Sequence, residues 1–167
     1  MKILNASLIM VALAASLLGC WKQHDEIGIS GDGATAFVSE VTITEVDLDY
    51  KTVEEISNDY MNLLRRAGWQ VEKTWATKTK PFKLSFKGSG NLKIVKNVPD
   101  FYVVKKIDEK SLRMWFIPAE ARGGKSSRSI TFNTALLGGA KVFDSHGQRV
   151  STIEYVNSRT PYLVVFR

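Results

Sequence analysis

The sequence has few of the residues that build disulfides, thiol sites and histidine-based metal sites. Its 167 residues include one cysteine, Cys20, and two histidines, His24 and His146. A single cysteine excludes an intramolecular disulfide and a redox pair of cysteines. Zinc sites built from histidine and cysteine are likewise unsupported, because structural sites of this kind take four such ligands. We therefore expect neither a metal nor a cofactor.

The sequence also lacks an apolar run of the length that crosses a bilayer. The longest run lies near the N-terminus, where Lys2 precedes residues 3–18, of which only three are polar. A spanning helix needs about 20 apolar residues, and this run is shorter. A basic start, a short apolar run and a small residue follow the order of a secretory signal peptide. We predict a signal peptide over residues 1–19.

The apolar run closes on Leu17-Leu18-Gly19-Cys20, which resembles the lipobox of bacterial lipoproteins. The resemblance implies cleavage before Cys20 and acylation of its thiol and amine. Lipidation would account for an unpaired cysteine in an oxidising compartment and would remove thiol mechanisms. We expect an exported, lipid-anchored protein with a short tether over residues 20–26, at the periplasmic face of the outer membrane if the host is Gram-negative. An uncleaved signal anchor is the alternative.

The charges of the expected mature chain are unevenly distributed. Residues 20–167 carry 22 basic and 17 acidic side chains. Residues 39–72 hold eight acidic and three basic residues, whereas residues 73–110 hold ten lysines and three acidic residues. A basic face favours anionic partners, which outside the cytoplasm are lipid headgroups, anionic glycans or acidic protein surfaces more often than nucleic acid. A lysine-rich face that serves only solubility is the alternative.

Hydrophobic periodicity predicts a single α+β domain over residues 27–167, with one amphipathic helix packed on a largely antiparallel β-sheet. We expect the helix over about residues 52–67, because Thr52-Val-Glu-Glu55 matches a capping box and the apolar stripe ends at Gly68. Strands are expected at residues 27–30, 34–46, 69–75, 82–86, 101–107, 112–117, 130–136, 140–143, 150–156 and 162–166. Residues 88–100 are expected to be a connection.

Residues 27–92 resemble the LppM-type lipoprotein domain. The shared features are the Gly31-Asp32-Gly33 turn between two opening strands, the amphipathic helix, and the Gly68-Trp69 pair before a strand that leads to a second strand ending in Phe86. The resemblance implies a membrane-anchored binding domain with affinity for anionic phospholipid.

Two basic segments are candidates for binding an anionic partner. One holds lysines that precede, alternate with or follow the apolar residues of the strand expected at 82–86: Lys78, Lys80, Lys83, Lys87, Lys93 and Lys96. The other is a polar loop expected over residues 119–129, with Arg122, Lys125 and Arg128. Its first part matches a permissive phosphate-binding loop, but the strand-like residues 129–134 stand where such a loop needs a helix.

Catalytic motifs are weak, and we predict no catalytic residues. Glu45, Asp47 and Asp49 alternate onto one side of a strand end, where carboxylates bind calcium or act as acid and base, although a solvated strand end before the helix is the better explanation. His146 lies beside Asp144 and Ser145 in one turn, which is poor geometry for a triad.

The leading hypothesis is a membrane-anchored envelope lipoprotein that acts as a non-enzymatic binding or assembly module. Three alternatives stay open at this point. The domain could bind anionic lipid or lipopolysaccharide directly, or inhibit another protein through the 119–129 loop. It could also be an envelope hydrolase that uses Asp47, Asp49 or Glu54.

Overall fold

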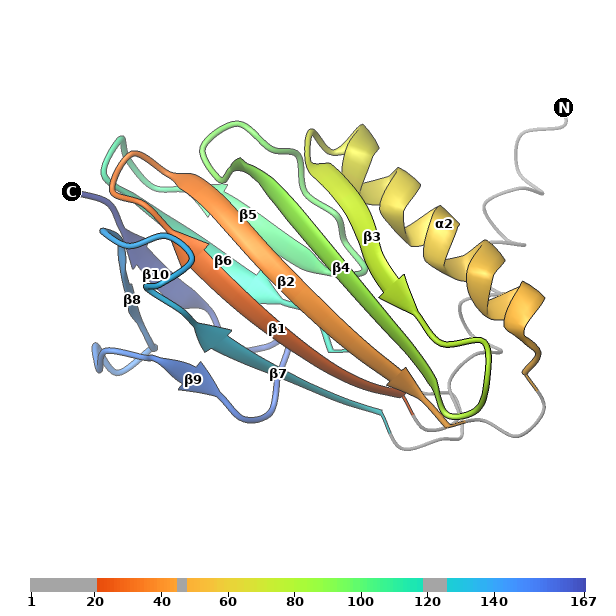
Figure 1. The fold of residues 1–167 in the computed structure, drawn as a ribbon. Helices are drawn as coiled ribbons and strands as arrows, with labels where there is room; N and C mark the ends of the chain where they lie inside the picture. The colour runs from red at the N-terminus through yellow and green to blue at the C-terminus, as the bar shows by residue number, and fades with distance from the viewer. Residues whose placement is uncertain (1–20, 45–47, 119–125) are drawn as a thin grey trace, which may run out of the picture.

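The computed structural model describes residues 21–44, 48–118 and 126–167, and it confirms the predicted α+β class (Figure 1). Within these ranges, one helix, α2 (Tyr50–Arg66), accompanies two mostly antiparallel sheets. The larger sheet has the order β3-β4-β2-β1-β7-β9, and the smaller has the order β5-β6-β10-β8. The strands are β1 (Trp21–Ile29), β2 (Ala34–Ile43), β3 (Gln70–Ala76), β4 (Phe82–Asn91), β5 (Tyr102–Lys106), β6 (Ser111–Phe116), β7 (Ser127–Phe132), β8 (Lys141–Phe143), β9 (Thr152–Ile153) and β10 (Tyr162–Val165).

The helix and the smaller sheet cover the same face of the larger sheet (Figure 1). The ring of Tyr60 on α2 lies 5.2 Å from that of Phe86 on β4 and 4.3 Å from that of Phe101, just before β5. Phe116 on β6 lies 6.1 Å from Phe132 on β7. The apolar core therefore fills the space between two layers, because each layer buries one face against the other.

The predicted alternation along β4 is confirmed. Phe82, Leu84 and Phe86 are 2–4% exposed and face the core, whereas Lys83 and Lys87 are exposed on the other face. Successive side chains of a strand point to opposite faces, so a sheet with one buried face shows this pattern in its sequence. Among the described residues, no helix is long and apolar enough to cross a membrane.

The first strand begins earlier than predicted, at Trp21, so a flexible tether over residues 20–26 is wrong from residue 21 onward. Trp21 pairs with Ile43 of β2 and packs partly buried against the core. Gln23 and Asp25 occupy inward positions of the same strand and are 6% and 3% exposed. Polar residues at inward positions hide the apolar alternation that reveals a strand, which is why the prediction began the strand at Ile27.

Strand β4 extends through Gly88 and Gly90, which the sequence analysis placed in a connection. A Cβ at Gly88 would lie 2.4 Å from the ring of Phe37, and one at Gly90 would lie 2.7 Å from the ring of Trp69. The two glycines leave room for these rings, which meet edge to face at 5.4 Å. Glycine here marks close packing over a strand, not its end.

Strand β7 corrects the predicted loop over residues 119–129, because Ser127–Phe132 pairs with β1 in parallel. Residues 119–125 of that loop, with Arg122 and Lys125, lie outside the described residues. Strand β7 follows these residues at the place where a phosphate-binding loop needs a helix, which agrees with the prediction that no such loop is present. The strand predicted at 150–156 is confined to Thr152–Ile153.

The helix starts at Tyr50, two residues before the predicted start, because its N-cap is Asp49 and not Thr52. One carboxylate oxygen of Asp49 accepts a 2.7 Å hydrogen bond from the backbone N–H of Thr52. An N-cap acceptor of this kind satisfies a donor that the helix leaves unpaired. The helix buries Val53 and Leu64 of the predicted stripe, together with Met61, which the predicted stripe did not include.

The cap makes stability depend on pH. Hydrogen bonds from Thr52 hold the pKa of the Asp49 carboxyl below its ordinary value. A lowered pKa in the folded state contributes stability above the ordinary value, and this stability is lost as the pH falls through the folded-state pKa. We expect Asp49→Ala to lower the urea midpoint at neutral pH, and the difference from wild type to shrink in acid. Asp49→Asn, which keeps an acceptor at the cap, should lose less stability than Asp49→Ala at neutral pH. Its difference from wild type should change with pH by the same amount, because it also lacks the ionisable group.

Candidate functional site

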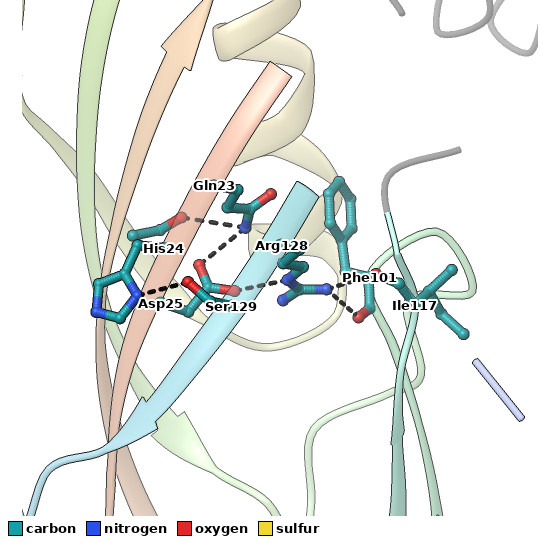
Figure 2. Close-up of polar contacts among 8 residues, drawn as sticks. Gln23, His24, Asp25, Phe101, Ile117, Arg128 and Ser129 are labelled. Atoms are coloured by element: carbon teal, nitrogen blue, oxygen red, sulfur yellow. Dashed lines mark hydrogen bonds and ion pairs between the residues drawn. The ribbon is translucent and has the colours of Figure 1, made fainter. Parts of the chain in front are cut away.

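A buried ion pair joins the two layers of the fold. Arg128 of β7 and Asp25 of β1 are 7% and 3% exposed, and Nε of the guanidinium donates to Oδ2 of the carboxylate at 2.7 Å. Figure 2 shows the guanidinium reaching across to the smaller layer, where Nη1 donates to the carbonyls of Phe101 and Ile117 at 2.7 and 2.8 Å. Arg128 therefore belongs to the interior and not to a basic surface loop, which corrects its predicted role.

The other oxygen of Asp25 is also occupied. The side-chain amide of Gln23 donates to Oδ1 of Asp25 at 2.8 Å (Figure 2). The same amide donates to the hydroxyl of Ser39 at 3.2 Å. A buried charge is tolerated when it is both paired and hydrogen-bonded. Burial of the nearby hydroxyl of Tyr60, with the negative charge of Asp25 as a further cause, raises the pKa of this tyrosine. Its phenol therefore stays neutral.

A cavity of about 50 Å³ borders this network and is lined otherwise by aliphatic and aromatic side chains and by Thr35. Ligand pockets usually measure about 300–1,000 Å³, so this space suits a few water molecules at most. In the part of the chain that the structure describes, the cavity beside the Asp25–Arg128 pair is too small for a typical substrate. We interpret it as a structural network that aligns the two sheets.

A larger groove lies where residues 92–97 face the β5–β6 hairpin. It measures about 330 Å³, and its apolar lining includes Leu92, Leu112 and Phe166, each at most 4% exposed. The groove is also lined by three exposed lysines, Lys93, Lys96 and Lys106. We call this feature the lysine groove. It combines two predicted lysines with Lys106, which the sequence analysis did not single out.

The charge balance of the lysine groove is positive. Its acidic residue is Asp108, whose carboxylate accepts hydrogen bonds from the Ser111 hydroxyl and the Lys110 N–H, both at 2.8 Å. These bonds, with a smaller contribution from the charge of Lys106, hold the pKa of Asp108 below its ordinary value. Nζ of Lys93 lies 4.6 Å from the ring centroid of Phe166. Cations above an apolar surface suit a partner with an anionic group and an apolar part.

Residues 92–97 are held in place by backbone contacts and by one tyrosine. The hydroxyl of Tyr102 donates to the carbonyl of Lys96 and accepts from the indole N–H of Trp69, both at 2.6 Å. The amide oxygen of Asn97 accepts from the backbone N–H of Val104 at 2.7 Å. Residues 92–97 are thus fixed to β5 and to Trp69, which directly precedes β3.

Tyr102→Phe tests that attachment. The substitution removes one hydroxyl and leaves the Trp69 N–H and the Lys96 carbonyl without that partner, so we expect a loss of about 1–3 kcal/mol in the free energy of unfolding. Faster amide hydrogen exchange over residues 92–97 should accompany it. Tyr155→Phe is the matched control, because Tyr155 is 81% exposed, and it should change neither measurement. An unchanged exchange rate in the Tyr102 variant would contradict this role.

The six predicted lysines do not form one surface. Lys93 and Lys96 border the groove, next to the end of β4. Lys78 and Lys80 lie in the turn before β4, with their amino groups 5.6 Å from the ring centroid of Tyr50 and 5.9 Å from that of Phe82. The remaining two, Lys83 and Lys87, are exposed along β4, and Lys87 pairs with Glu72 at 2.8 Å. The set is therefore divided between the two ends of one strand.

The carboxylates considered for catalysis have ordinary structural roles where they are described. Asp49 is the exposed helix cap, and Glu54 accepts from the Tyr50 hydroxyl at 3.3 Å and lies 3.6 Å from Lys73. Glu45 and Asp47 lie outside the described residues. Within the described ranges, no group of three or more His, Cys, Asp or Glu residues is placed to hold a metal ion.

The turn at residues 144–147 agrees with its prediction. One carboxylate oxygen of Asp144 accepts from the backbone N–H groups of His146 and Gln148, both at 2.9 Å. The carboxylate is therefore engaged with the turn's own backbone, not with the imidazole. His24, which the sequence analysis placed in the tether, lies in β1 with Nδ1 2.9 Å from the Ser129 hydroxyl (Figure 2).

Comparisons with known proteins assign no family. No family model matches the chain, and no curated protein matches its sequence. Part of the crystal structure of an M1 zinc metallopeptidase from Deinococcus radiodurans matches 89% of this chain, with 8% sequence identity and a TM-score of 0.37. The chain spans 42% of that protein's length. A likeness this distant indicates neither a shared family nor a shared activity.

Proposed function

We propose that this protein is a lipid-anchored, non-enzymatic binding or assembly module of the bacterial cell envelope. One observation carries the proposal. The lipobox-like Leu17-Leu18-Gly19-Cys20 stands immediately before the folded domain, because β1 begins at Trp21. Cleavage before Cys20 would leave a mature chain that is in a strand from its second residue. The acyl chains then supply the membrane affinity and the domain supplies recognition.

The lysine groove is the surface that supports recognition. Its size falls in the range of ligand sites, and its three lysines and apolar lining fit an anionic partner with an apolar part. An acidic segment of an envelope protein has this chemistry, as does an anionic glycan or lipid. For the alternative roles, the hydrolase carboxylate Asp49 is occupied as a helix cap, and the inhibitory loop lies mainly in residues 119–125, outside the described residues.

The anchor is tested by Cys20→Ala. Two acyl chains give stable anchoring, because each buried CH₂ contributes about 0.8 kcal/mol. We expect the wild-type protein to stay with the membrane fraction through a high-salt wash and to show the added mass of the lipid. The variant should lack that mass and should no longer be retained through acyl chains. A native protein with an unmodified thiol would overturn the proposal.

The groove is tested with a soluble polyanion as the probe. We expect the pair Lys93→Gln and Lys96→Gln to weaken binding to heparin by roughly tenfold, since about 1.4 kcal/mol corresponds to that factor. The matched control is Lys83→Gln with Lys87→Gln, which removes the same charge from β4 and should weaken binding much less. Equal losses from both pairs would show that binding follows net charge and not the groove.

A further inference from the structure

One end of the larger sheet lies directly beside the expected lipidation site. In the strand register, Trp21 of β1 is opposite Ile43 of β2, which is opposite Phe82 of β4. The β3–β4 turn (residues 77–81), the start of α2 and the start of β7 lie at this same end (Figure 1). We call this feature the proximal end.

The distance between the anchor and the proximal end is short. Consecutive Cα atoms are about 3.8 Å apart, so the Cα of Cys20 lies within about 4 Å of that of Trp21. Neighbouring strands are about 4.8 Å apart, which places Phe82 roughly 10 Å from Trp21. Trp21 is itself paired with β2 and packed against the core. Because β1 begins at Trp21, the domain lies closer to the anchor than it would with a tether extended over residues 20–26.

The β3–β4 turn presents two cations at the proximal end. Lys78 and Lys80 are exposed, and their amino groups lie 5–6 Å from the ring centroids of Tyr50 and Phe82. The turn is closed by Thr77, whose N–H donates to the Lys83 carbonyl at 2.9 Å and whose hydroxyl accepts from the Lys83 N–H at 2.8 Å. Asp49, the exposed N-cap of α2, lies at the same end, and its carboxylate interacts with the charge of Lys80, while the acidic Glu45 and Asp47 fall in the undescribed link between β2 and α2. The proposal therefore concerns the turn and not the net charge of this end.

The lysine groove lies at the opposite end of the sheet. Asn91, just before the groove, pairs with Ala34 at the start of β2, whereas Ile43 at the end of β2 pairs with Phe82. The ten residues of β2 therefore separate the two ends by roughly 30 Å at 3.2–3.4 Å per residue. The potential of an anionic membrane falls off over about 8–10 Å at physiological ionic strength. Lys78 and Lys80, unlike the groove lysines, are close enough to respond to it, as are the exposed Lys22 beside Trp21 and Lys51 at the start of α2.

We propose that the proximal end faces the membrane and that Lys78 and Lys80 contact anionic phospholipid headgroups. This inference rests on the lipid anchor of the proposed function. The larger sheet then stands with β1 running away from the leaflet, and the lysine groove opens toward the surrounding compartment. The two groups of candidate lysines have different partners, because only one of them lies at the lipid surface.

The orientation is tested on the lipidated full-length protein in vesicles of phosphatidylcholine and phosphatidylglycerol. Cys20 carries the lipid, so a second cysteine can be labelled selectively. Thr79→Cys places a fluorescent donor in the β3–β4 turn, and Glu109→Cys places it in the exposed β5–β6 turn beside the groove. With an acceptor on the lipid headgroups, we expect strong energy transfer from residue 79 and weak transfer from residue 109.

The outcomes separate the two proposals. Equal transfer, or stronger transfer from residue 109, in protein that floats with vesicles at high salt would overturn the orientation and leave the anchor intact. Protein that does not float at high salt would overturn the anchor and this inference with it. Strong transfer confined to residue 79 supports both.

Charge variants test the headgroup contact. Transfer from residue 79 should rise when phosphatidylglycerol is added to phosphatidylcholine vesicles, and Lys78→Gln with Lys80→Gln should abolish that rise. Lys105→Gln with Lys110→Gln removes the same charge from the exposed β5–β6 hairpin and should preserve the rise. If both pairs preserve it, or both abolish it, the assigned contact is wrong. Far-ultraviolet circular dichroism checks that each variant is folded.

Discussion

Asp25→Ala is expected to lower the free energy of unfolding by about 3–5 kcal/mol, because it leaves the guanidinium of Arg128 buried without its counter-charge. Arg128 is 7% exposed and cannot reach water without separating the layers that its hydrogen bonds to Phe101 and Ile117 join. Domains of this size are stable by about 5–15 kcal/mol, so the loss is a large share of the total stability. Urea denaturation followed by tryptophan fluorescence measures the loss.

The double variant Asp25→Ala with Arg128→Met separates the cost of an unpaired charge from the net contribution of the pair. Replacing both partners with uncharged groups removes the isolated buried charge, so the double variant should be more stable than Asp25→Ala alone. This difference is the coupling that a double-mutant cycle measures. A double variant as unstable as the sum of the two single variants would show that the pair is not coupled.

Phe116→Ala should cost a similar amount, about 3–5 kcal/mol, through a different mechanism. Phe116 is 1% exposed, and its ring lies 6.1 Å from that of Phe132 and 6.0 Å from that of Tyr162. Truncation opens a cavity between the layers, next to the guanidinium of Arg128, whose Cζ lies 5.8 Å from the ring. The same urea titration applies.

Ile94→Ala is the control for the Phe116 substitution. Ile94 is 80% exposed, and substitutions of surface residues usually change stability by less than about 0.5 kcal/mol. Phe116→Leu should fall between the two, since it keeps part of the buried volume. A loss below about 1 kcal/mol for Phe116→Ala would mean that the layers repack around the site.

Local patterns predicted the parts of the fold whose inward residues are apolar. The helix followed from the stripe that includes Val53 and Leu64, and β4 followed from the alternation of Phe82, Leu84 and Phe86. The boundaries were less well predicted, because Asp49 offers a cap three residues before Thr52. Strand β4 continues through Gly88 and Gly90, which normally punctuate a strand and here admit aromatic rings.

The candidate site was predicted only in part. Lysine density pointed to Lys93 and Lys96, which do border the groove, but the sequence has no local signal that adds Lys106. The strand expected at 82–86 already placed Lys78 and Lys80 before it and Lys93 and Lys96 after it, but the extension of β4 to Asn91, which sets their separation, was not predicted. The sequence did contain one signal for the buried polar positions of β1 that the prediction missed. Gln23 and Asp25 continue the alternation of Ile27 and Ile29 toward the N-terminus.

By itself, the sequence determined the α+β class, the helix and the apolar faces of several strands, since each depends on neighbours within a few positions. The lipobox resemblance is local in the same way. Only the tertiary structure decided that Asp25 is buried, that Arg128 is its partner 103 positions away, and that the β-structure divides into two sheets. The reason is physical, because a charged residue can face inward only where a distant partner compensates its desolvation.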